Sequence, residues 1–225
     1  NSIDEKILFN CNDCDKISID PNNDMPDVNR INNSVRTHGL FKKVDPFRIN
    51  FIGKINYPVK NTLYIAPALG YNYHNGFMGG ILVHNYFLPK RNFEFAVAPM
   101  YGFKNQQLAG VGNINYTWQM NDGLFKNIIL GVDARRFAFD NNEDKVTQSS
   151  HFSKVNPYLE FNIRNNDRLS KVRQTIKLSC NNVEEDYWYD KKSETSLFTR
   201  LTYNYENNRT LDPWKFNLFV ENNES

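Results

Sequence analysis

The sequence predicts an all-β protein whose main part is an antiparallel transmembrane β-barrel, preceded by the end of a small β-domain. Three observations predict this fold. Apolar and polar residues alternate with a period of two from residue 47 onward, as they do in strands with unlike faces. The alternating runs reach about ten residues, the length at which a tilted strand crosses a bilayer. No run approaches the roughly 18 apolar residues of a membrane-spanning helix.

The first 45 or so residues differ from the rest. KILFN (6–10) and KISID (16–20) are typical of short strands, and NCNDCD lies between them. A polar run then follows, with Pro21, Pro26 and Gly39 as breakers. This part is interpreted as the tail of one β-domain followed by an ordered linker. A strand pair this small cannot bury a core alone.

From residue 47 the alternation predicts about ten strands and no helix. The segment NFEFAVAPMYGF (92–103) shows the pattern, because Phe93, Phe95, Val97 and Tyr101 share one parity while Ala96, Ala98 and Gly102 share the other. The predicted runs cover residues 47–57, 63–71, 79–88, 93–103, 114–118, 126–140, 155–163, 172–180, 197–205 and 214–220. We expect the alternate positions with large apolar side chains to face lipid, and the positions between them to face the interior of the barrel.

Lipid is favoured over a soluble core for three reasons. The runs are longer than the usual five or six residues of soluble sheets. The positions between the large apolar residues are rich in Arg, Lys, Asn, Glu and Thr or in small residues. Such residues are typical of a barrel interior that is filled with water or tightly packed. Aromatic residues gather near run ends, as in an interfacial girdle: Tyr57, Tyr71, Tyr73, Tyr86, Trp118 and Trp214. Prolines inside runs, at Pro67, Pro99 and Pro157, predict β-bulges.

Little in the sequence points to chemistry, and no catalytic, cofactor-binding or metal-binding residue is predicted. The net charge of +2 gives no footprint of nucleic-acid binding. None of the four histidines (His38, His74, His84 and His151) belongs to an HExxH pair. His38 and His74 are interpreted as loop residues, and His84 as a strand residue that could face a lumen.

The three cysteines, Cys11, Cys14 and Cys180, form no even disulfide framework. Cys11 and Cys14 make one CxxC without a second pair, and a zinc site would need four ligands. The simpler interpretation is a strand-end turn that carries two thiols. Cys180 lies on the lipid parity of its run and is interpreted as a small apolar residue.

Three stretches carry a family likeness: SIDPNNDMPDVNRINNSVRTHGLFKKVDPF (18–47), LYIAPALGYNYHNGFMGGILVHNYFLPKRNFEFAVAPMYGF (63–103) and NRTLDPWKFNL (208–218). They resemble the C-terminal region of large Bacteroidetes-type gluzincin aminopeptidase-like proteins, which carry a zinc peptidase module, a β-sandwich and an outer-membrane β-barrel. The resemblance covers the chain from about residue 16 to residue 220.

The resemblance implies a division of labour. Residues 1–33 would be the tail of the sandwich, 34–46 a linker, and 47–225 the beginning of the barrel, which is expected to be partial. HExxH, a downstream Glu ligand and a GxMEN-like stretch are absent, so no catalytic residue is carried over and zinc is expected only in an upstream module. The implied partners are outer-membrane lipid and that peptidase module, in a Gram-negative bacterium.

Three functions stay open. The first is a non-catalytic barrel that anchors the aminopeptidase-like module. The second is a transport barrel for anionic solutes or peptides, with a pore lined by Arg48, Lys54, Arg135, Arg164, Arg173, Lys177 and Arg200. The third is a soluble β-barrel or sandwich that binds an apolar ligand in its interior.

Overall fold

The computed structural model describes residues 14–22, 24–27, 33–38, 48–51, 62–86, 90–145, 147–165, 167, 169–190 and 193–224. It divides into two compact units, Asn1–Leu63 and Tyr64–Ser225. All twelve elements in the described ranges are β-strands. No helix among the described residues is long and apolar enough to cross a membrane.

In the first unit, two short strands form an antiparallel pair, β1 (Lys16–Ser18) and β2 (Ser34–Arg36). Asp20 has a positive φ of 54°, and its carboxylate accepts hydrogen bonds from the backbone N–H groups of Asp24 and Met25, at 2.8 and 2.9 Å. These bonds fix the turn after β1. β1 falls within the predicted run KISID, whereas β2 falls in the segment assigned to a linker. The predicted run KILFN lies outside the described residues.

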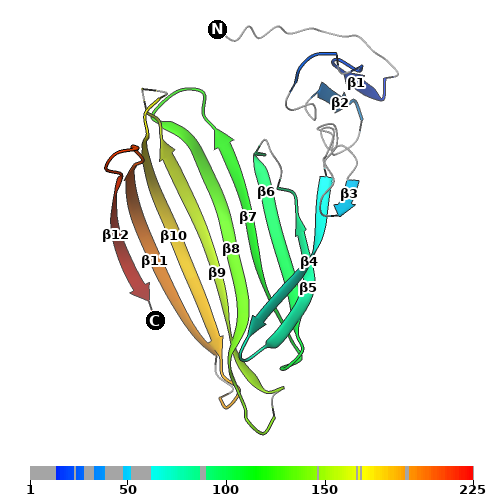
Figure 1. Ribbon diagram of the computed structural model, residues 1–225, viewed down its shortest axis with the longest axis vertical. Coiled ribbons are helices and arrows are strands. Elements are labelled where there is room, and N and C mark those ends of the chain that lie inside the picture. Colours follow the sequence, from blue (N-terminus) through cyan, green and yellow to red (C-terminus); the bar gives the residue numbers. More distant parts are fainter. Residues whose placement is uncertain are drawn as a thin grey trace. The chain divides into compact units, whose positions relative to one another are not determined.

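The main sheet has ten strands in the order β12-β11-β10-β9-β8-β7-β6-β5-β4-β3, so each strand pairs with its neighbours in sequence (Figure 1). This confirms the predicted all-β fold with ten strands in one sheet. Among the described residues no pairing joins β12 to β3, and the sheet is therefore open. Its strands are β3 (Arg48–Phe51), β4 (Thr62–Asn72), β5 (Gly76–His84), β6 (Phe93–Gly102), β7 (Gln107–Gln119), β8 (Phe125–Asn141), β9 (Ser149–Ile163), β10 (Val172–Asp186), β11 (Ser193–Asn207) and β12 (Trp214–Glu224).

The strands run between two ends of the sheet. The lower end in Figure 1 is where β4, β6, β8 and β10 end and where β5, β7, β9 and β11 begin. The upper end is where β5, β7, β9 and β11 end and where β6, β8, β10 and β12 begin.

The strand register places the alternating residues in rows that cross the sheet. One row of directly opposed residues is apolar on seven successive strands, β6 to β12: Phe93, Tyr116, Leu130, Leu159, Leu178, Leu201 and Val220. A row on the opposite side is polar on six strands, β7 to β12: Gln119, Asn127, Asn162, Thr175, Asn204 and Asn217. The sheet therefore has an apolar face and a polar face, because opposed residues in a ladder project to the same side.

The prediction of bulges at the prolines is wrong. The ladder between β4 and β5 runs through Pro67 without a shift. Pairing is interrupted beside Pro99 between β5 and β6, and beside Pro157 between β9 and β10, but the register resumes unchanged. A proline removes a donor on one side of its strand only, so the ladder on the other side continues. Register shifts occur instead in the β8–β9 ladder, at Phe125/Asn127 and Ala138/Asp140.

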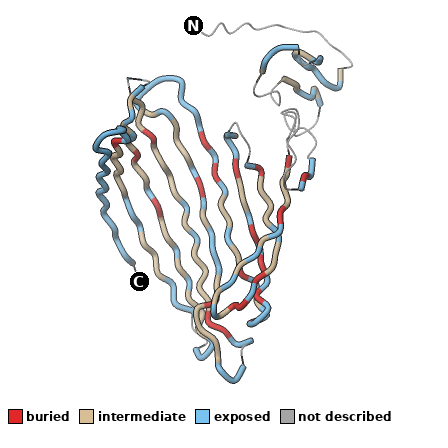
Figure 2. The backbone as a smooth tube through the Cα atoms, in the orientation of Figure 1, coloured by how far each residue is buried: buried red, intermediate tan, exposed pale blue. Residues whose placement is uncertain are grey.

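The lower end of the sheet curls tightly with the polar face inside. The turn after β4 hydrogen-bonds to β8, although three strands lie between them. In a flat sheet these strands would be four spacings, or roughly 19 Å, apart. Met78, Met100 and Ala109 are buried here, and Ala68 and Phe137 pack against them. Figure 2 shows buried positions gathered where β4, β5 and β8 converge.

Candidate functional site

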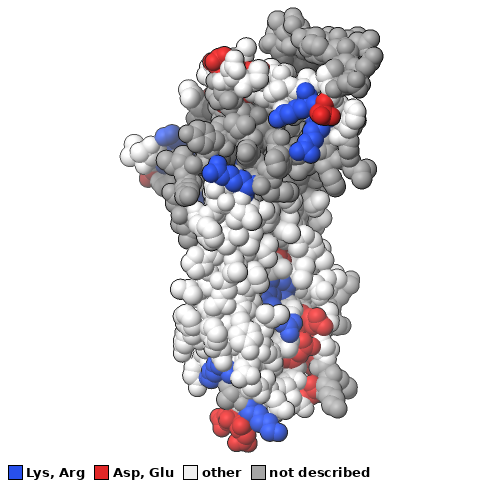
Figure 3. Space-filling view, turned by 90° about the vertical axis from the view of Figure 1, so that its right-hand side faces the viewer, with Lys and Arg blue, Asp and Glu red and all other residues white. Residues whose placement is uncertain are grey.

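The apolar face of the sheet is exposed. Leu69 on β4 is 70% exposed, Leu130 on β8 47%, and Leu218 on β12 55%. The apolar residues that are buried within the described ranges are only alanines and methionines: Ala66, Met78, Ala98, Met100, Ala109 and Ala138. Figure 3 shows a broad stretch without charged side chains on the left of the middle of the surface that it presents, with charged side chains to its right. This is the reverse of an ordinary soluble protein, which places Leu, Ile, Val and Phe inside.

Aromatic pairs flank the apolar face at both ends of the strands. At the upper end, Tyr116 packs on Trp118 with ring centroids 4.7 Å apart, and Tyr205 stacks on Trp214 at 4.8 Å. At the lower end, Phe77 stacks on Phe103 at 6.0 Å. The upper pairs consist of Tyr and Trp, whose rings have a polar group, whereas the lower pair consists of two Phe rings without one.

Below the apolar face, strands β8 to β10 extend into a charged cluster on the same side of the sheet. Asp186 Oδ2 lies 2.9 Å from His151 Nε2, and Arg136 donates from Nη1 to Ser153 Oγ at 2.7 Å. Arg136 Nη2 also contacts His151 Nε2. Arg136, His151 and Asp186 contact one another through His151 Nε2, whereas His151 Nδ1 is buried without a partner among the described residues. The cluster marks the point at which the run of apolar side chains on this face ends.

The polar face carries a connected network in its upper half. Asn113 donates to Asp133 Oδ1 at 2.5 Å and accepts from Tyr86 Oη and Asn115 Nδ2, each at 3.0 Å. Burial, and then the nearby Glu94 carboxylate, raise the pKa of Tyr86, which lies beyond the end of β5. Neutral phenol and amide groups in this network position one another, but it contains no nucleophile paired with a base.

The structure places only some of the cations that were predicted to line a pore on the polar face of the sheet. Arg135, Arg173, Lys177 and Arg200 share the polar face. Arg164 instead lies past the end of β9, where it donates to the carbonyls of Met120, Gly123 and Phe125. Arg48 is exposed on β3 in the first unit, and Lys54 lies outside the described residues.

Two of the cations on the polar face already have partners. Arg200 forms an ion pair with Glu221 on β12 at 2.5 Å. The amine of Lys177 lies 4.1 Å from the centre of the Tyr158 ring. The ring itself lies over Gly131, where an added Cβ would come within 2.4 Å of it. These contacts hold the side chains in place against the sheet.

At the lower end, four asparagines form a group that we call the asparagine clasp: Asn72, Asn75, Asn105 and Asn141. Asn75 is 1% exposed, accepts from Ala138 N at 2.9 Å and donates to Asn105 Oδ1 at 3.3 Å. Asn105 in turn donates to Ser149 Oγ at 3.1 Å, and Asn141 donates to the carbonyl of His74 at 2.8 Å. The clasp ties the β4–β5 turn to β8 and β9. The buried residues Met78, Met100 and Ala109 lie next to it, toward the upper end of the sheet.

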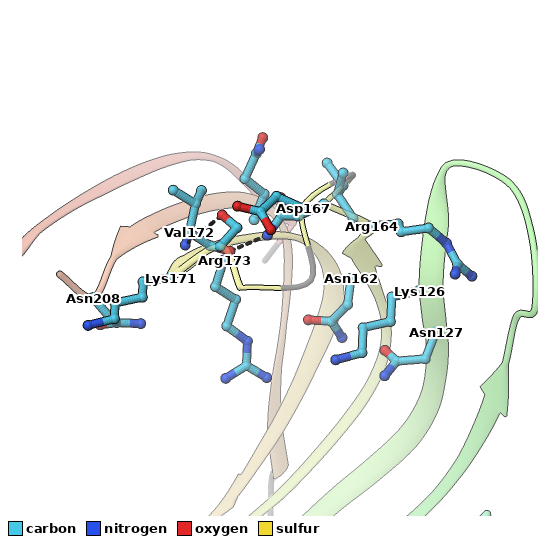
Figure 4. A pocket seen from close by; sticks show the side chains of 13 residues that line it. Lys126, Asn127, Asn162, Arg164, Asp167, Lys171, Val172, Arg173 and Asn208 are labelled. Carbon is cyan, nitrogen blue, oxygen red and sulfur yellow. Dashed lines mark hydrogen bonds between the residues drawn. The ribbon is translucent and has the colours of Figure 1, made fainter.

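At the upper end, a cavity of about 610 Å³ opens between β8, β9 and β10 (Figure 4). We call it the rim cavity. Its described lining includes four cations, Lys126, Arg164, Lys171 and Arg173, but a single carboxylate, Asp167. Figure 4 shows Lys126, Asn162 and Arg173 projecting to the same side of the strands. A volume of this size accommodates a small molecule or a chain end.

Sequence reasoning missed the clasp and Lys126. The clasp asparagines stand in turns or at strand ends, where Asn is ordinary, and only the curl brings them together. Lys126 lies beside the register shift at Phe125/Asn127, so its parity carries no information about its side of the sheet. No simple signal in the sequence would have found either feature.

Metal and cysteine chemistry is limited in this part of the chain. No three His, Cys, Asp or Glu residues among those described are grouped so that they could hold a metal ion. Cys14 is disulfide-bonded, which corrects the interpretation of it as a free thiol; Cys11 lies outside the described residues. Cys180 is a free, half-buried thiol opposite Thr199, in line with Leu178 and Leu201 on the apolar face.

No family model, curated protein or solved structure matches this chain significantly. The function is therefore inferred from the residues themselves.

Proposed function

We propose that this chain forms part of the wall of an outer-membrane β-barrel, and that the barrel anchors an aminopeptidase-like zinc peptidase module without catalysing a reaction itself. The apolar row from Phe93 to Val220, with its counterpart in the polar row, carries the membrane part of the proposal. Large apolar side chains outside and polar or small ones inside are the pattern of a transmembrane barrel.

The dimensions support the same environment. On β7, every second residue from Leu108 to Trp118 lies on the apolar face, and each of them is apolar or glycine. This stretch advances roughly 33 Å along the strand, or about 25 Å at the roughly 40° tilt of membrane barrels. That height is close to the apolar band of outer-membrane barrels, about 25 Å.

Closure of the wall is part of the proposal. Among the described residues no strand pairs with the outer edge of β12, and lipid offers the N–H and C=O groups of such an edge no hydrogen-bond partner. In a membrane, the edge strands of this sheet must pair with each other or with further strands. The proposal therefore requires a closed wall in which the ten strands are one contiguous part.

An anchor is favoured over a pore by the contents of the polar face. The lower end is filled by Met78, Met100 and Phe137 and is tied by the asparagine clasp. Higher on the same face, Lys177 and Arg200 are engaged with Tyr158 and Glu221. The packed side chains at the lower end and the engagement of Lys177 and Arg200 reduce the wet surface that a solute could follow through the sheet's polar side. We therefore expect the barrel to be silent in planar-bilayer conductance; stable channel openings would favour the transport function instead.

The link to a peptidase is supported by the stretches 18–47, 63–103 and 208–218 that resemble the gluzincin-associated region. It is tested by isolating the native protein from outer membranes and sequencing the polypeptide that contains peptides of this chain. An HExxH motif and a later Glu ligand on the same polypeptide would support the anchor. A polypeptide without them removes the peptidase from the proposal but leaves the barrel.

Membrane insertion is tested separately, on the full chain folded in the presence of lipid vesicles. We expect it to float with the vesicles after a high-salt wash, and to migrate differently on a gel before and after boiling, as closed membrane barrels do. A chain that stays monodisperse in buffer without detergent and does not float would instead support a soluble β-domain. The variant Leu130→Arg should reduce flotation, whereas Leu211→Arg, outside the strands, should not.

A further inference from the structure

The rim cavity has an excess of positive charge that its own residues do not use. Arg164 is occupied by backbone carbonyls, and Lys171 donates to Thr210 Oγ1 at 3.0 Å. Asp167, the single lining carboxylate, accepts from the N–H of Leu169 at 2.9 Å and so serves its own loop. Lys126 and Arg173 remain, and neither side chain has a hydrogen bond or ion pair with any described residue.

Two acids on the neighbouring strands form no ion pair with Lys126 or Arg173, although the Glu206 carboxylate and Arg173 attract each other at longer range. Glu206 lies opposite Arg173 in the ladder, but Glu206 Oε1 is bonded to Lys215 Nζ at 3.1 Å. Glu160, on β9, accepts from Asn162 Nδ2 at 2.9 Å. Both carboxylates therefore have partners of their own, and the cavity between β8 and β10 retains a net positive field.

A third group in the wall of the rim cavity, the side-chain amide of Asn127, restricts the chemistry of the anion. Asn127 lies on β8 beside Lys126, and its Oδ1 is buried and accepts no hydrogen bond from the described part of the chain. A buried acceptor without a partner is unfavourable, and an anion alone cannot satisfy it. The complementary ligand carries a negative oxygen pair and, close by, an N–H donor.

We propose that the rim cavity binds the terminal carboxylate of a peptide, which lies between Lys126 and Arg173 while the last peptide N–H is donated to Asn127 Oδ1. The backbones of β8 and β10 are two strand spacings, or roughly 10 Å, apart, and both long cationic side chains reach a carboxylate in that gap. The guanidinium fork of Arg173 matches the two carboxylate oxygens. Asn162, held by Thr175 Oγ1 at 3.0 Å and by Glu160, forms the floor between them.

This assignment needs only the upper ends of β8, β9 and β10, so it stands or falls independently of the membrane anchor and the peptidase. The test uses the full chain folded in detergent micelles and three probes: the dipeptide acetyl-Ala-Ala, its C-terminal amide, and inorganic phosphate. Binding is measured by calorimetry at low salt. We expect the free acid to bind roughly tenfold or more tightly than the amide, because the amide lacks the charge that the two cations recognise.

The variants Lys126→Gln and Arg173→Gln should each weaken acid binding roughly tenfold, and Arg173→Lys should weaken it less. Lys154→Gln is the matched control, because it removes a cation from the polar face of β9 far from the cavity. Circular dichroism checks that each variant keeps its strands, and the comparison of acid with amide on the unmodified chain needs no variant. Equal binding of acid and amide, or phosphate binding as tight as that of the dipeptide, would overturn the proposal.

Discussion

The side chain of Asn75 in the β4–β5 turn accepts a hydrogen bond from the backbone N–H of Ala138 on β8, at 2.9 Å and across 63 residues of sequence. Ala138 pairs with His151 on β9, but it lies past the last pair of the β7–β8 ladder, Gly110 with Arg136, so β7 does not bond the other side of its backbone. Asn72 Nδ2 also approaches the Ala138 carbonyl at 3.5 Å. The relationship exists only because the sheet curls, and it makes the clasp a direct reporter of that curl.

The first prediction concerns this contact. Asn75→Ala removes the acceptor and leaves the buried N–H of Ala138 without a partner, so we expect the free energy of unfolding to fall by about 1–3 kcal/mol. Unfolding by urea in detergent micelles, followed by tryptophan fluorescence, measures the change. Asn121→Ala, at an exposed turn position, is the control and should change stability by less than about 0.5 kcal/mol. Equal effects of the two substitutions would show that the clasp contributes nothing.

Gly131 gives the second prediction. Its added Cβ would lie 2.4 Å from Tyr158 Cζ, so Gly131→Ala must displace the ring. We expect a loss of about 1–3 kcal/mol, typical of overpacking. At Gly112, on the neighbouring strand, a Cβ would meet Val97 Cγ1 at an ordinary 3.5 Å, and Gly112→Ala should be nearly neutral.

A double-mutant cycle assigns this loss to the ring. In the background Tyr158→Ala, the substitution Gly131→Ala should have little further effect, because the obstacle is gone. If it is as damaging as before, the cause lies in the backbone of β8 rather than in the tyrosine.

The third prediction separates lipid from water at the apolar face. Leu130 lies in the apolar row and is 47% exposed. In a bilayer, Leu130→Arg should lower the free energy of unfolding by more than about 1 kcal/mol and by up to about 4 kcal/mol, depending on how close Leu130 lies to the midplane. Leu211→Arg, in the β11–β12 connection where Leu211 is 83% exposed, should cost less than about 1 kcal/mol. The idea of a lipid-facing row would fail if both changes were equally mild in lipid.

The fourth prediction uses a native thiol. Cys180 is free, half-buried and on the apolar face. In protein inserted into vesicles, we expect a membrane-permeant maleimide to label Cys180 and a charged, impermeant one to fail. Both reagents should label it after unfolding, and peptide mass spectrometry locates the modified residue. Leu211→Cys supplies an aqueous control that both reagents should label; rapid labelling of Cys180 by the charged reagent would place this face in water.

Much of the sheet could be predicted from the sequence, because a period of two fixes the side of each residue without knowledge of its partners. Leu159, Leu178 and Leu201 were assigned to one face from their own runs, and the ladders align them in one row. A slip of one residue would turn a whole run to the wrong side, so the alternation also restricts the register. Strand number and face are therefore encoded locally.

The remaining features depend on how strands combine. Pro99 and Pro157 lack a donor on one edge, and only the neighbouring strand decides whether that gap becomes a bulge or an interruption. The charged cluster of Arg136, His151 and Asp186 draws on three strands, and its position follows from their relative lengths. The rim cavity likewise needs Lys126 and Arg173 to face the same way across β9. No pattern within a single run carries such information.

The clasp also has a consequence for the order of events in folding. Each neighbouring pair of strands closes a short loop, whereas Asn75 meets Ala138 only after β5, β6 and β7 are in register between them. Contacts of such sequence separation form late, because the chain must first lose the entropy of all the intervening segments. The clasp therefore acts on the lifetime of the assembled sheet: Asn75→Ala should accelerate unfolding and leave the rate of folding almost unchanged.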